Sequence, residues 1–91
     1  MTFEWNGKKA VRNLGKHGVS FHEAATVFGD LLSLTFSDPD HSIDEERFIT
    51  IGTSHTGRIL MVAHLDRGER IRIISARKAT AREREHYEKE E

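Results

Sequence analysis

Three consecutive segments in the second half of the chain alternate between apolar and polar residues, and very short joints separate them. The segments are 47–54, 58–65 and 69–76, and the joints are His55-Thr56-Gly57 and Asp66-Arg67-Gly68. Alternation with a period of two is typical of β-strands. Three-residue joints with glycine at the left-handed position connect the strands of antiparallel hairpins. The pattern therefore predicts an antiparallel sheet, to which the alternating segment 32–37 adds a further strand.

Helices are predicted before and after this sheet region in the sequence. Asn6 is a favourable N-cap and Gly18 a typical left-handed stop, so one helix lies between them, with Ala10, Val11 and Leu14 on its apolar side. A second helix begins at the capping box 20–23, carries Phe21, Ala24, Ala25 and Phe28 on one face, and ends at Gly29. A last helix begins at Ala81, after the capping box 80–83. The segment 3–5 is a short first strand.

This order of elements predicts one α+β domain over residues 1–91. We expect two N-terminal helices packed on one face of a mainly antiparallel sheet, with a C-terminal helix. A chain of 91 residues can bury one small core. The absence of cysteine excludes a disulfide framework and a thiolate metal site. The longest apolar run, 59–63, is too short to span a membrane, and no leader pattern is evident, so we expect a cytoplasmic protein.

The predicted hairpins fix which residues share a face of the sheet. Three-residue joints place Ile51 opposite Met61, and Ala63 opposite Ile71. One face then collects Ile49, Ile51, Ile59, Met61, Ala63, Leu65, Ile71 and Ile73, and we expect it to meet the N-terminal helices. The other face collects Phe48, Thr50, Leu60, Val62, His64, Arg70, Arg72 and Ile74. The last helix offers only Ala81 and Tyr87 as apolar candidates, so we expect this second face to stay partly open.

Charge is strongly segregated along the chain, although the net charge is only −1. Residues 8–16 carry four cations and no carboxylate, residues 38–46 carry five carboxylates and no Lys or Arg, and residues 67–84 carry seven cations against two carboxylates. The stretch RIRIISARKAT, residues 70–80, gathers much of the last group. Two interpretations remain open: the arginine stems pack over neighbouring apolar residues with their heads in water, or the surface binds a partner.

The residues themselves resemble a known family. The blocks FEW, NLGKHGVSFHEAATVFGD, DPDHSIDEERFITIGTSHTGR and IRIISARKAT, followed by a glutamate and a tyrosine, are similar to BrnT toxins of bacterial type II toxin–antitoxin systems, over residues 3–87. The resemblance implies a RelE-like fold and a ribonuclease that arrests growth by cleaving RNA. It also implies a cognate BrnA-like antitoxin with a ribbon-helix-helix domain. The pair would repress its own operon, with operator DNA contacted only through the antitoxin.

The resemblance implies metal-independent chemistry, in which the 2′-hydroxyl of the RNA attacks the neighbouring phosphate. Arginine suits the phosphate clamp because its planar fork binds two phosphate oxygens. The candidate catalytic residues are Arg70, Arg72, Arg77, Lys78 and His64. Further candidates for RNA binding are Lys16, Arg47 and Arg82, and those for antitoxin binding are Phe48, Leu60, Val62, Ile74 and Tyr87. His17, His41, Glu46 and Tyr87 are weaker candidates for proton transfer. No cofactor is expected, and the acidic segment 38–46 lacks the spacing of an EF-hand metal site.

Three functional classes follow from the sequence. The first is a ribonuclease toxin, which rests mainly on the family resemblance. The second is a noncatalytic module that binds an antitoxin or nucleic acid, because no general base is obvious. The third is a degenerate toxin that retains only a regulatory role.

Overall fold

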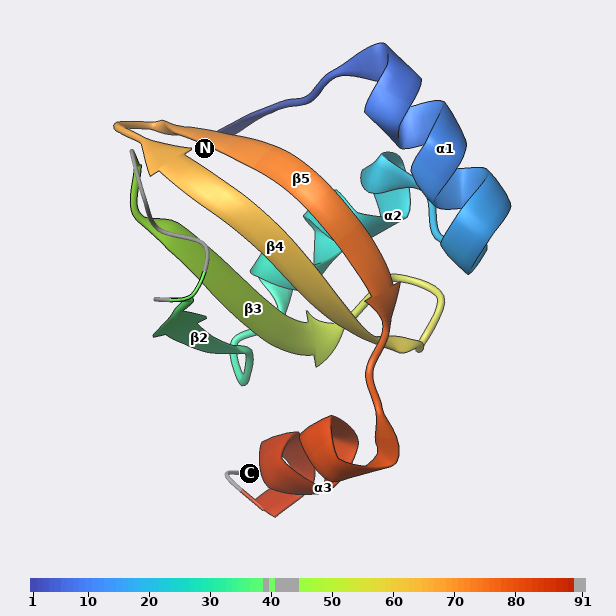
Figure 1. Ribbon diagram of the computed structural model, residues 1–91. Helices are drawn as coiled ribbons and strands as arrows, with labels where there is room; N and C mark the ends of the chain where they lie inside the picture. The colour runs from blue at the N-terminus through green and yellow to red at the C-terminus, as the bar shows by residue number, and fades with distance from the viewer. Residues whose placement is uncertain (39, 41–44, 90–91) are drawn as a thin grey trace.

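A computed structural model describes residues 1–38, 40 and 45–89 of the chain. Five strands in the described residues form one sheet with the order β1-β5-β4-β3-β2, and the helices lie on both of its faces (Figure 1). The predicted α+β class with a mainly antiparallel sheet is confirmed. No helix in this part of the chain is both long and apolar enough to cross a membrane. The elements are β1 (Thr2–Glu4), α1 (Gly7–His17), α2 (Phe21–Thr26), the 3₁₀ turn η1 (Val27–Gly29), β2 (Leu34–Ser37), β3 (Arg47–Thr53), β4 (Ile59–Arg67), β5 (Arg70–Lys78) and α3 (Ala81–Lys89).

The first predicted hairpin register is confirmed. Ile51 of β3 pairs with Met61 of β4, and the backbone N–H of Ser54 donates to the carbonyl of Arg58 across the joint. Gly57 has a φ of 87°, which a side chain would disfavour. The joint therefore has three residues with glycine at the left-handed position, as its sequence predicts.

The second predicted register is wrong. Arg67 pairs directly with Arg70, so the turn contains only Gly68 and Glu69. Asp66 faces Ile71, and a bulge near Ala63 shifts the pairing again, so that Ala63 lies opposite Ser75 instead of Ile71. A change of one residue in a hairpin joint moves each side chain of a strand to face a different partner.

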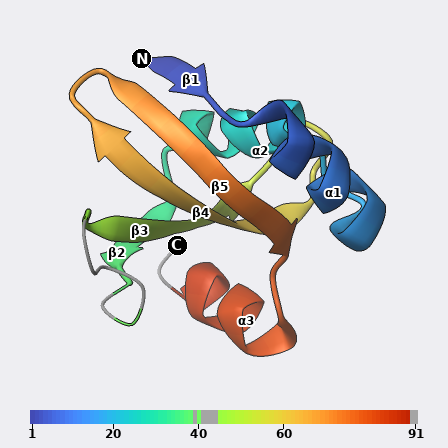
Figure 2. The ribbon, with the colours of Figure 1, turned by 45° about the horizontal axis from the view of Figure 1, so that its top comes forward.

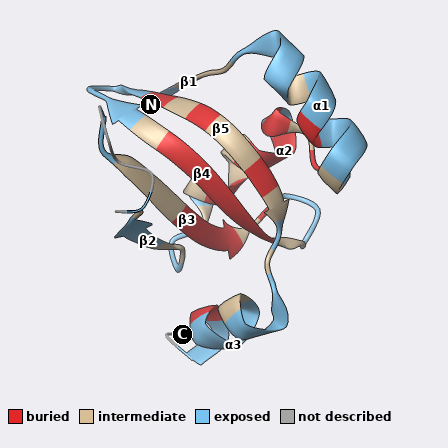
Figure 3. Ribbon diagram, viewed as in Figure 1, coloured by how far each residue is buried: buried red, intermediate tan, exposed pale blue. Residues whose placement is uncertain are grey.

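This shift exchanges the faces expected for β3 and β4. Leu60 and Val62, expected on the open face, are fully buried with Ile73 and Ala76 in the main core (Figure 3). The helical part of that core comes from Val19, Phe21, Ala24 and Val27. The isoleucines of β5 that were predicted to face the N-terminal helices do so. They share that face with the other set of β4 side chains, not with the predicted set. Both sets in β4 are apolar, so hydropathy alone could not choose between them.

The opposite face of the sheet holds a smaller cluster beneath α3. Tyr87 is buried there with Ile51 and Met61, and Leu34, Ile49 and Ile59 pack around them. The Tyr87 hydroxyl donates to the carboxylate of Asp30 and lies 3.0 Å from the Thr53 hydroxyl. Figure 2 shows α3 on the far side of the sheet from α2. Tyr87 therefore anchors the second half of α3 to this face of the sheet.

Helix α1 has the predicted caps but an unexpected orientation. The Asn6 side chain accepts from the N–H of Lys9, and Gly18 ends the helix with a φ of 68°. Only Ala10 of the predicted apolar side packs partly against the core, whereas Val11 and Leu14 are 73% and 53% exposed. The predicted burial of these two residues is wrong.

A polar side chain holds α1 to the sheet instead. Strand β1 pairs with the first part of β5 only, from Arg70 to Arg72, which leaves the edge of β5 open beyond it. The Asn13 carboxamide closes this edge: it donates to the Ala76 carbonyl at 2.8 Å and accepts from the Ala76 N–H at 3.1 Å. It also donates to the Val19 carbonyl at 2.9 Å. Asn13 thus takes the place of a neighbouring strand, because an amide carries the same donor and acceptor as a peptide unit.

We expect Asn13→Ala to lower the free energy of unfolding by roughly 2–3 kcal/mol, because it leaves buried groups of Ala76 and Val19 without partners. Asn13→Asp should also destabilise the fold, because a carboxylate cannot donate to the two carbonyls. Urea denaturation measures both effects. Lys8→Ala, on the exposed side of the same helix, is the control and should change stability by less than about 0.5 kcal/mol. Equal stability of Asn13→Ala and wild type would contradict this role.

Candidate functional site

The predicted arginine clamp of β5 is already engaged by a carboxylate. Glu4 of β1 lies in register with Arg72, and its carboxylate is 3.0 Å from the guanidinium of Arg72 and 3.2 Å from that of Arg70. Arg67 also approaches Glu4 and makes two hydrogen bonds with Glu45. The parallel pairing of β1 with β5, which the sequence did not predict, brings Glu4 to this position. A phosphate could reach Arg70 and Arg72 only in competition with Glu4.

Arg77 is engaged in a similar way. Its guanidinium donates two parallel hydrogen bonds to Glu83, at 2.8 and 3.0 Å. Glu83 also accepts from the N–H of Thr80 and completes the predicted capping box of α3, which is confirmed. The same carboxylate therefore caps the helix and fixes the arginine. Lys78, the next residue, is exposed and has no carboxylate partner among the described residues.

His64 lies in the core and not on an open face. It is 1% exposed, with Nδ1 at 2.8 Å from Asp66 and Nε2 at 2.8 Å from the hydroxyl of Thr50. The rings of Phe28 and Phe48 pack beside it. Burial lowers the pKa of His64, and its hydrogen bond with Asp66 acts in the opposite direction. The predicted placement of His64 opposite Arg70 on the charged face is wrong, because His64 pairs with Ile73 and faces the helices.

The surface predicted for the antitoxin is mostly closed. Leu60 and Val62 are fully buried, and Tyr87 is 3% exposed beneath α3. Phe48 and Ile74 are partly buried. These residues therefore do not form the open apolar face expected from the sequence, because the observed β4–β5 register differs from the predicted one.

The predicted RNA-binding residues lie far apart in the fold. Lys16 is exposed near the end of α1, Arg82 is exposed on α3, and Arg47 is partly buried at the start of β3. Glu46 is exposed just before β3, and His17 is partly buried at the end of α1. His41 lies outside the described residues.

Lys16 and His17 belong to a cationic groove between α1 and β5. The groove has a volume of about 290 Å³ and is lined by Lys9, Arg12, Asn13, Lys16, His17, Ile74 and Ser75. No carboxylate lines it, and its three cations have no carboxylate partner in the described part of the chain. We call it the α1–β5 groove. The sequence signal for it was the run of cations from residue 8 to 16, whose spacing places Lys9, Arg12 and Lys16 along one side of a helix.

A second cationic pocket lies at the end of the sheet. It has a volume of about 280 Å³ and is lined by Gly57, Arg58, Ile59, Lys78, Ala79 and Arg84. Arg58 reaches from this pocket toward the end of α1, because its Nη2 donates to the Gly18 carbonyl at 3.1 Å. Gly18 directly follows His17, which lines the α1–β5 groove. Arg58 therefore lines the second pocket and also contacts the end of α1, next to the α1–β5 groove.

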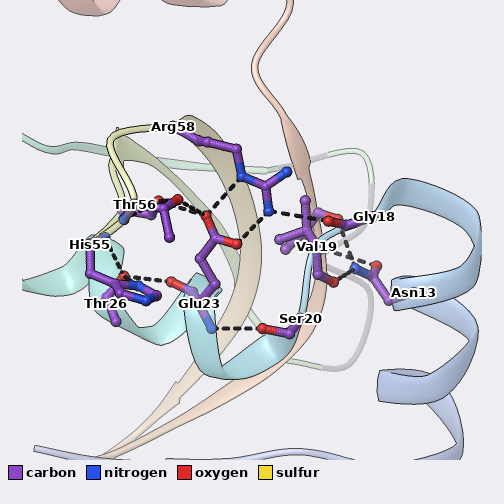
Figure 4. A network of polar contacts seen from close by, with 11 residues as sticks. Asn13, Gly18, Val19, Ser20, Glu23, Thr26, His55, Thr56 and Arg58 are labelled. Atoms are coloured by element: carbon purple, nitrogen blue, oxygen red, sulfur yellow. Dashed lines mark hydrogen bonds and ion pairs between the residues drawn. The ribbon is translucent and has the colours of Figure 1, made fainter.

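A buried carboxylate holds Arg58 in this position (Figure 4). Glu23 of α2 accepts from Arg58 Nε at 2.9 Å and also from Arg58 Nη2, and it accepts from the hydroxyls of Ser54 and Thr56 at 2.7 and 2.6 Å. Ser20 caps α2 as predicted, because its hydroxyl oxygen accepts a hydrogen bond from the backbone N–H of Glu23. The Glu23 side chain, however, extends to the β3–β4 joint. Hydrogen bonds from Arg58, and then from Thr56 and Ser54, outweigh burial and lower the pKa of Glu23 to about 2.

These groups can bind an extended polyanion. Cations spaced along one groove contact successive phosphates of a single strand, and apolar residues such as Ile74 contact sugar or base. The basic residues in the last turn of α1, Lys16 and His17, also offset the negative end of the helix dipole. No three His, Cys, Asp or Glu side chains of the described residues come together in a way that would hold a metal ion.

Comparisons with known proteins identify a protein family and a similar solved structure. Residues 5–83 match the model of a protein family described as the ribonuclease toxin BrnT of a type II toxin–antitoxin system. The fold is similar to the crystal structure of the Brucella abortus ribonuclease toxin BrnT, with a TM-score of 0.69 and 25% sequence identity. That match covers 88% of this chain and 97% of the other. A search of curated proteins found no match.

We expect the Glu23 network to make stability depend on acid pH. The pKa of Glu23 is about 2 in the folded chain and ordinarily about 4.5, so its contribution is present above about pH 5 and is lost as pH falls toward 2. Near neutral pH, Glu23→Gln should lower the free energy of unfolding by roughly 2–4 kcal/mol, because it leaves Arg58 without its counter-charge. The difference from wild type should shrink as pH falls from about 4.5 to 2. Urea denaturation at a series of pH values tests this.

The control for this experiment is Glu46→Gln, which removes an exposed carboxylate. Its stability should follow that of wild type at every pH. A constant difference between Glu23→Gln and wild type down to pH 2 would show that the charge of Glu23 is not what stabilises the network.

Proposed function

The chain belongs to the BrnT family of ribonuclease toxins of type II toxin–antitoxin systems, and from this we propose that it is a metal-independent endoribonuclease that arrests growth. A cognate antitoxin neutralises it. The proposal includes a RelE-like fold, a ribbon-helix-helix antitoxin, repression of the shared operon by the pair, and action in the bacterial cytoplasm. The family membership supports the RNA substrate and the antitoxin partner.

The choice of RNA-binding surface is based on the α1–β5 groove. Its lysines and arginine have no carboxylate partners in the described residues, whereas Arg70, Arg72 and Arg77 are each held by a glutamate. Binding a phosphate at free cations requires no ion pair to break. We therefore assign the RNA backbone to Lys9, Arg12 and Lys16, with Lys78 and Arg84 of the second pocket continuing the contact.

The reaction that fits these groups is attack by the 2′-hydroxyl of RNA on the adjacent phosphate. The 2′ O–H bond breaks, a bond forms from the 2′ oxygen to phosphorus, and the bond from phosphorus to the 5′ oxygen of the next nucleotide breaks. A 2′,3′-cyclic phosphate remains, and the leaving 5′ oxygen takes a proton from water. Cations beside the phosphate stabilise the charge that develops on its oxygens. His17 shares the groove with Lys9, Arg12 and Lys16, and we assign its imidazole as the acceptor of the 2′ proton.

The strand arginines form a rival clamp. Arg72 would bind a phosphate if Glu4 moved aside, and Arg77, farther along β5, would bind one if Glu83 moved aside. The two assignments predict that RNA binding depends on different cations of the protein, so a binding experiment distinguishes them.

We expect removal of the groove charges to weaken RNA binding strongly. The triple variant Lys9→Ala, Arg12→Ala, Lys16→Ala should raise the Kd for a labelled single-stranded RNA of 20 nucleotides at least tenfold near 0.1 M salt. It should also reduce the slope of log Kd against log salt by about 2, because each lost phosphate contact on a single strand contributes about 0.7. Fluorescence anisotropy measures both quantities.

The matched comparison is Arg72→Ala, Arg77→Ala, which removes the arginines of the rival clamp. This double variant should bind RNA as wild type does. Loss of binding in this variant, with wild-type binding by the triple variant, would move the site to the rival clamp.

We expect His17→Gln to act on the chemical step. It should lower the cleavage rate at saturating RNA by about 100-fold, while the Kd for RNA changes little. Single-turnover cleavage with excess protein gives the rate. His22→Gln, another histidine near the N-terminal helices, is the control. An unchanged cleavage rate for His17→Gln would exclude this residue as the proton acceptor.

A further inference from the structure

Helix α1 presents an apolar face that nothing in the described structure covers. Gly7, Val11, Leu14 and Gly15 recur at positions i, i+4, i+7 and i+8, which is the spacing of one side of a helix. Val11 and Leu14 are more than half exposed. We call these four residues the outer face of α1.

The outer face continues into a small apolar groove. Val11 and Leu14 line it together with Trp5, Phe21 and His22, and its volume is about 180 Å³. The ring of Trp5 is fixed by edge-on contacts with Phe21 at 5.9 Å and with His22 at 4.8 Å. A preformed groove beside an exposed helix face is suited to an amphipathic segment that inserts an apolar side chain.

The glycines of this face are not required by any close contact in the described structure. A Cβ added at Gly7 or Gly15 would meet nothing within 4 Å, and neither residue has a positive φ. Glycine in the interior of a helix is less favourable than alanine, so Gly15 lowers helix stability without any packing reason in the chain itself. Small residues on either side of Val11 do, however, let the backbone of a partner helix approach closely.

Charge indicates which partner fits. Lys8 and Arg12 flank the outer face, line a shallow pocket with Gly7 and Val11, and have no carboxylate partner among the described residues. A second copy of this chain would bring these cations against one another, which is unfavourable. A segment with apolar residues flanked by carboxylates would meet both features of the surface.

We propose that the outer face of α1 and its Trp5 groove are the docking site for an acidic amphipathic helix of the antitoxin. This inference rests on the proposed function for the existence of that partner. Arg12 lines both the pocket beside the outer face and the α1–β5 groove. A partner carboxylate on Arg12 removes one of the three cations that hold the RNA backbone, so docking on one side of α1 weakens RNA binding on the other.

The test uses the full chain and the product of the reading frame adjacent to its gene. Val11→Ser, Leu14→Ser should raise the Kd for that product at least tenfold by titration calorimetry. In cells, this double variant should still arrest growth when the product is co-expressed, whereas wild type is neutralised. Leu31→Ser, Leu32→Ser is the matched control, because these leucines are also exposed but lie far along the chain from α1. The control should bind and be neutralised like wild type.

Two further variants separate a docking role from a folding role. Gly15→Gln replaces glycine by a better helix former, so it should keep or raise the melting temperature while it weakens the complex. Lys8→Glu should weaken the complex more than Lys8→Gln does, because it reverses the charge that the partner meets.

The outcomes are distinct from those that test the proposed function. Equal affinity and neutralisation of wild type and the serine double variant would overturn the docking site, as would the absence of any binding by wild type. Self-association of wild type, or binding to anionic phosphatidylglycerol vesicles, that disappears in the double variant would overturn the choice of occupant. A wild-type protein that neither cleaves RNA nor arrests growth when induced alone would instead overturn the proposed function.

Discussion

The two-residue turn between β4 and β5 determines how the rest of the molecule is arranged. Because Arg67 pairs with Arg70, the isoleucines of β5 lie on the same side of the sheet as Leu60 and Val62, where α2 covers them. The alternate residues of β5 then face the other side, where Arg72 meets the carboxylate of Glu4. A turn longer by one residue would bring the arginines under the helices, where unpaired charges are strongly unfavourable. The turn therefore specifies both the core and the pairing of the strand arginines.

The sequence predicts local structure well where one residue type satisfies one backbone requirement. Asn6, Gly18 and the capping box of α3 mark helix ends because each supplies a hydrogen bond or a left-handed φ that the helix end needs. The order of elements and the first hairpin follow in the same way. The β4–β5 register could not be predicted, because DRG and the following Glu69 allow a two-residue turn as well as a three-residue one, and both faces of β4 are apolar.

The candidate site was harder to predict because it depends on contacts between distant segments. The basic stretch at 70–80 is prominent in the sequence, yet its charges are met by carboxylates from β1 and α3. Glu4 reaches them only through a parallel pairing that no local pattern indicates. The cations of residues 8–16 are less prominent, but no carboxylate of the described residues lies near enough to pair with them. Density of charge along a sequence therefore does not reveal which cations lack counter-charges in the described part of the fold.

Helix α1 reverses the usual distribution of side chains, and this explains how it can serve two surfaces. Most surface helices are held by an apolar stripe, which is then unavailable to a partner. Here the buried contact is made by Asn13, whose amide replaces a strand at the edge of β5. Three hydrogen bonds position the helix, so Val11 and Leu14 are not needed for packing and remain exposed. The cations on one side of α1 and the apolar residues on the other side then lie within one turn of each other along this helix. Arg12 lines both the α1–β5 groove and the pocket beside the outer face, so the proposed RNA and protein partners would compete for this residue without any change of fold.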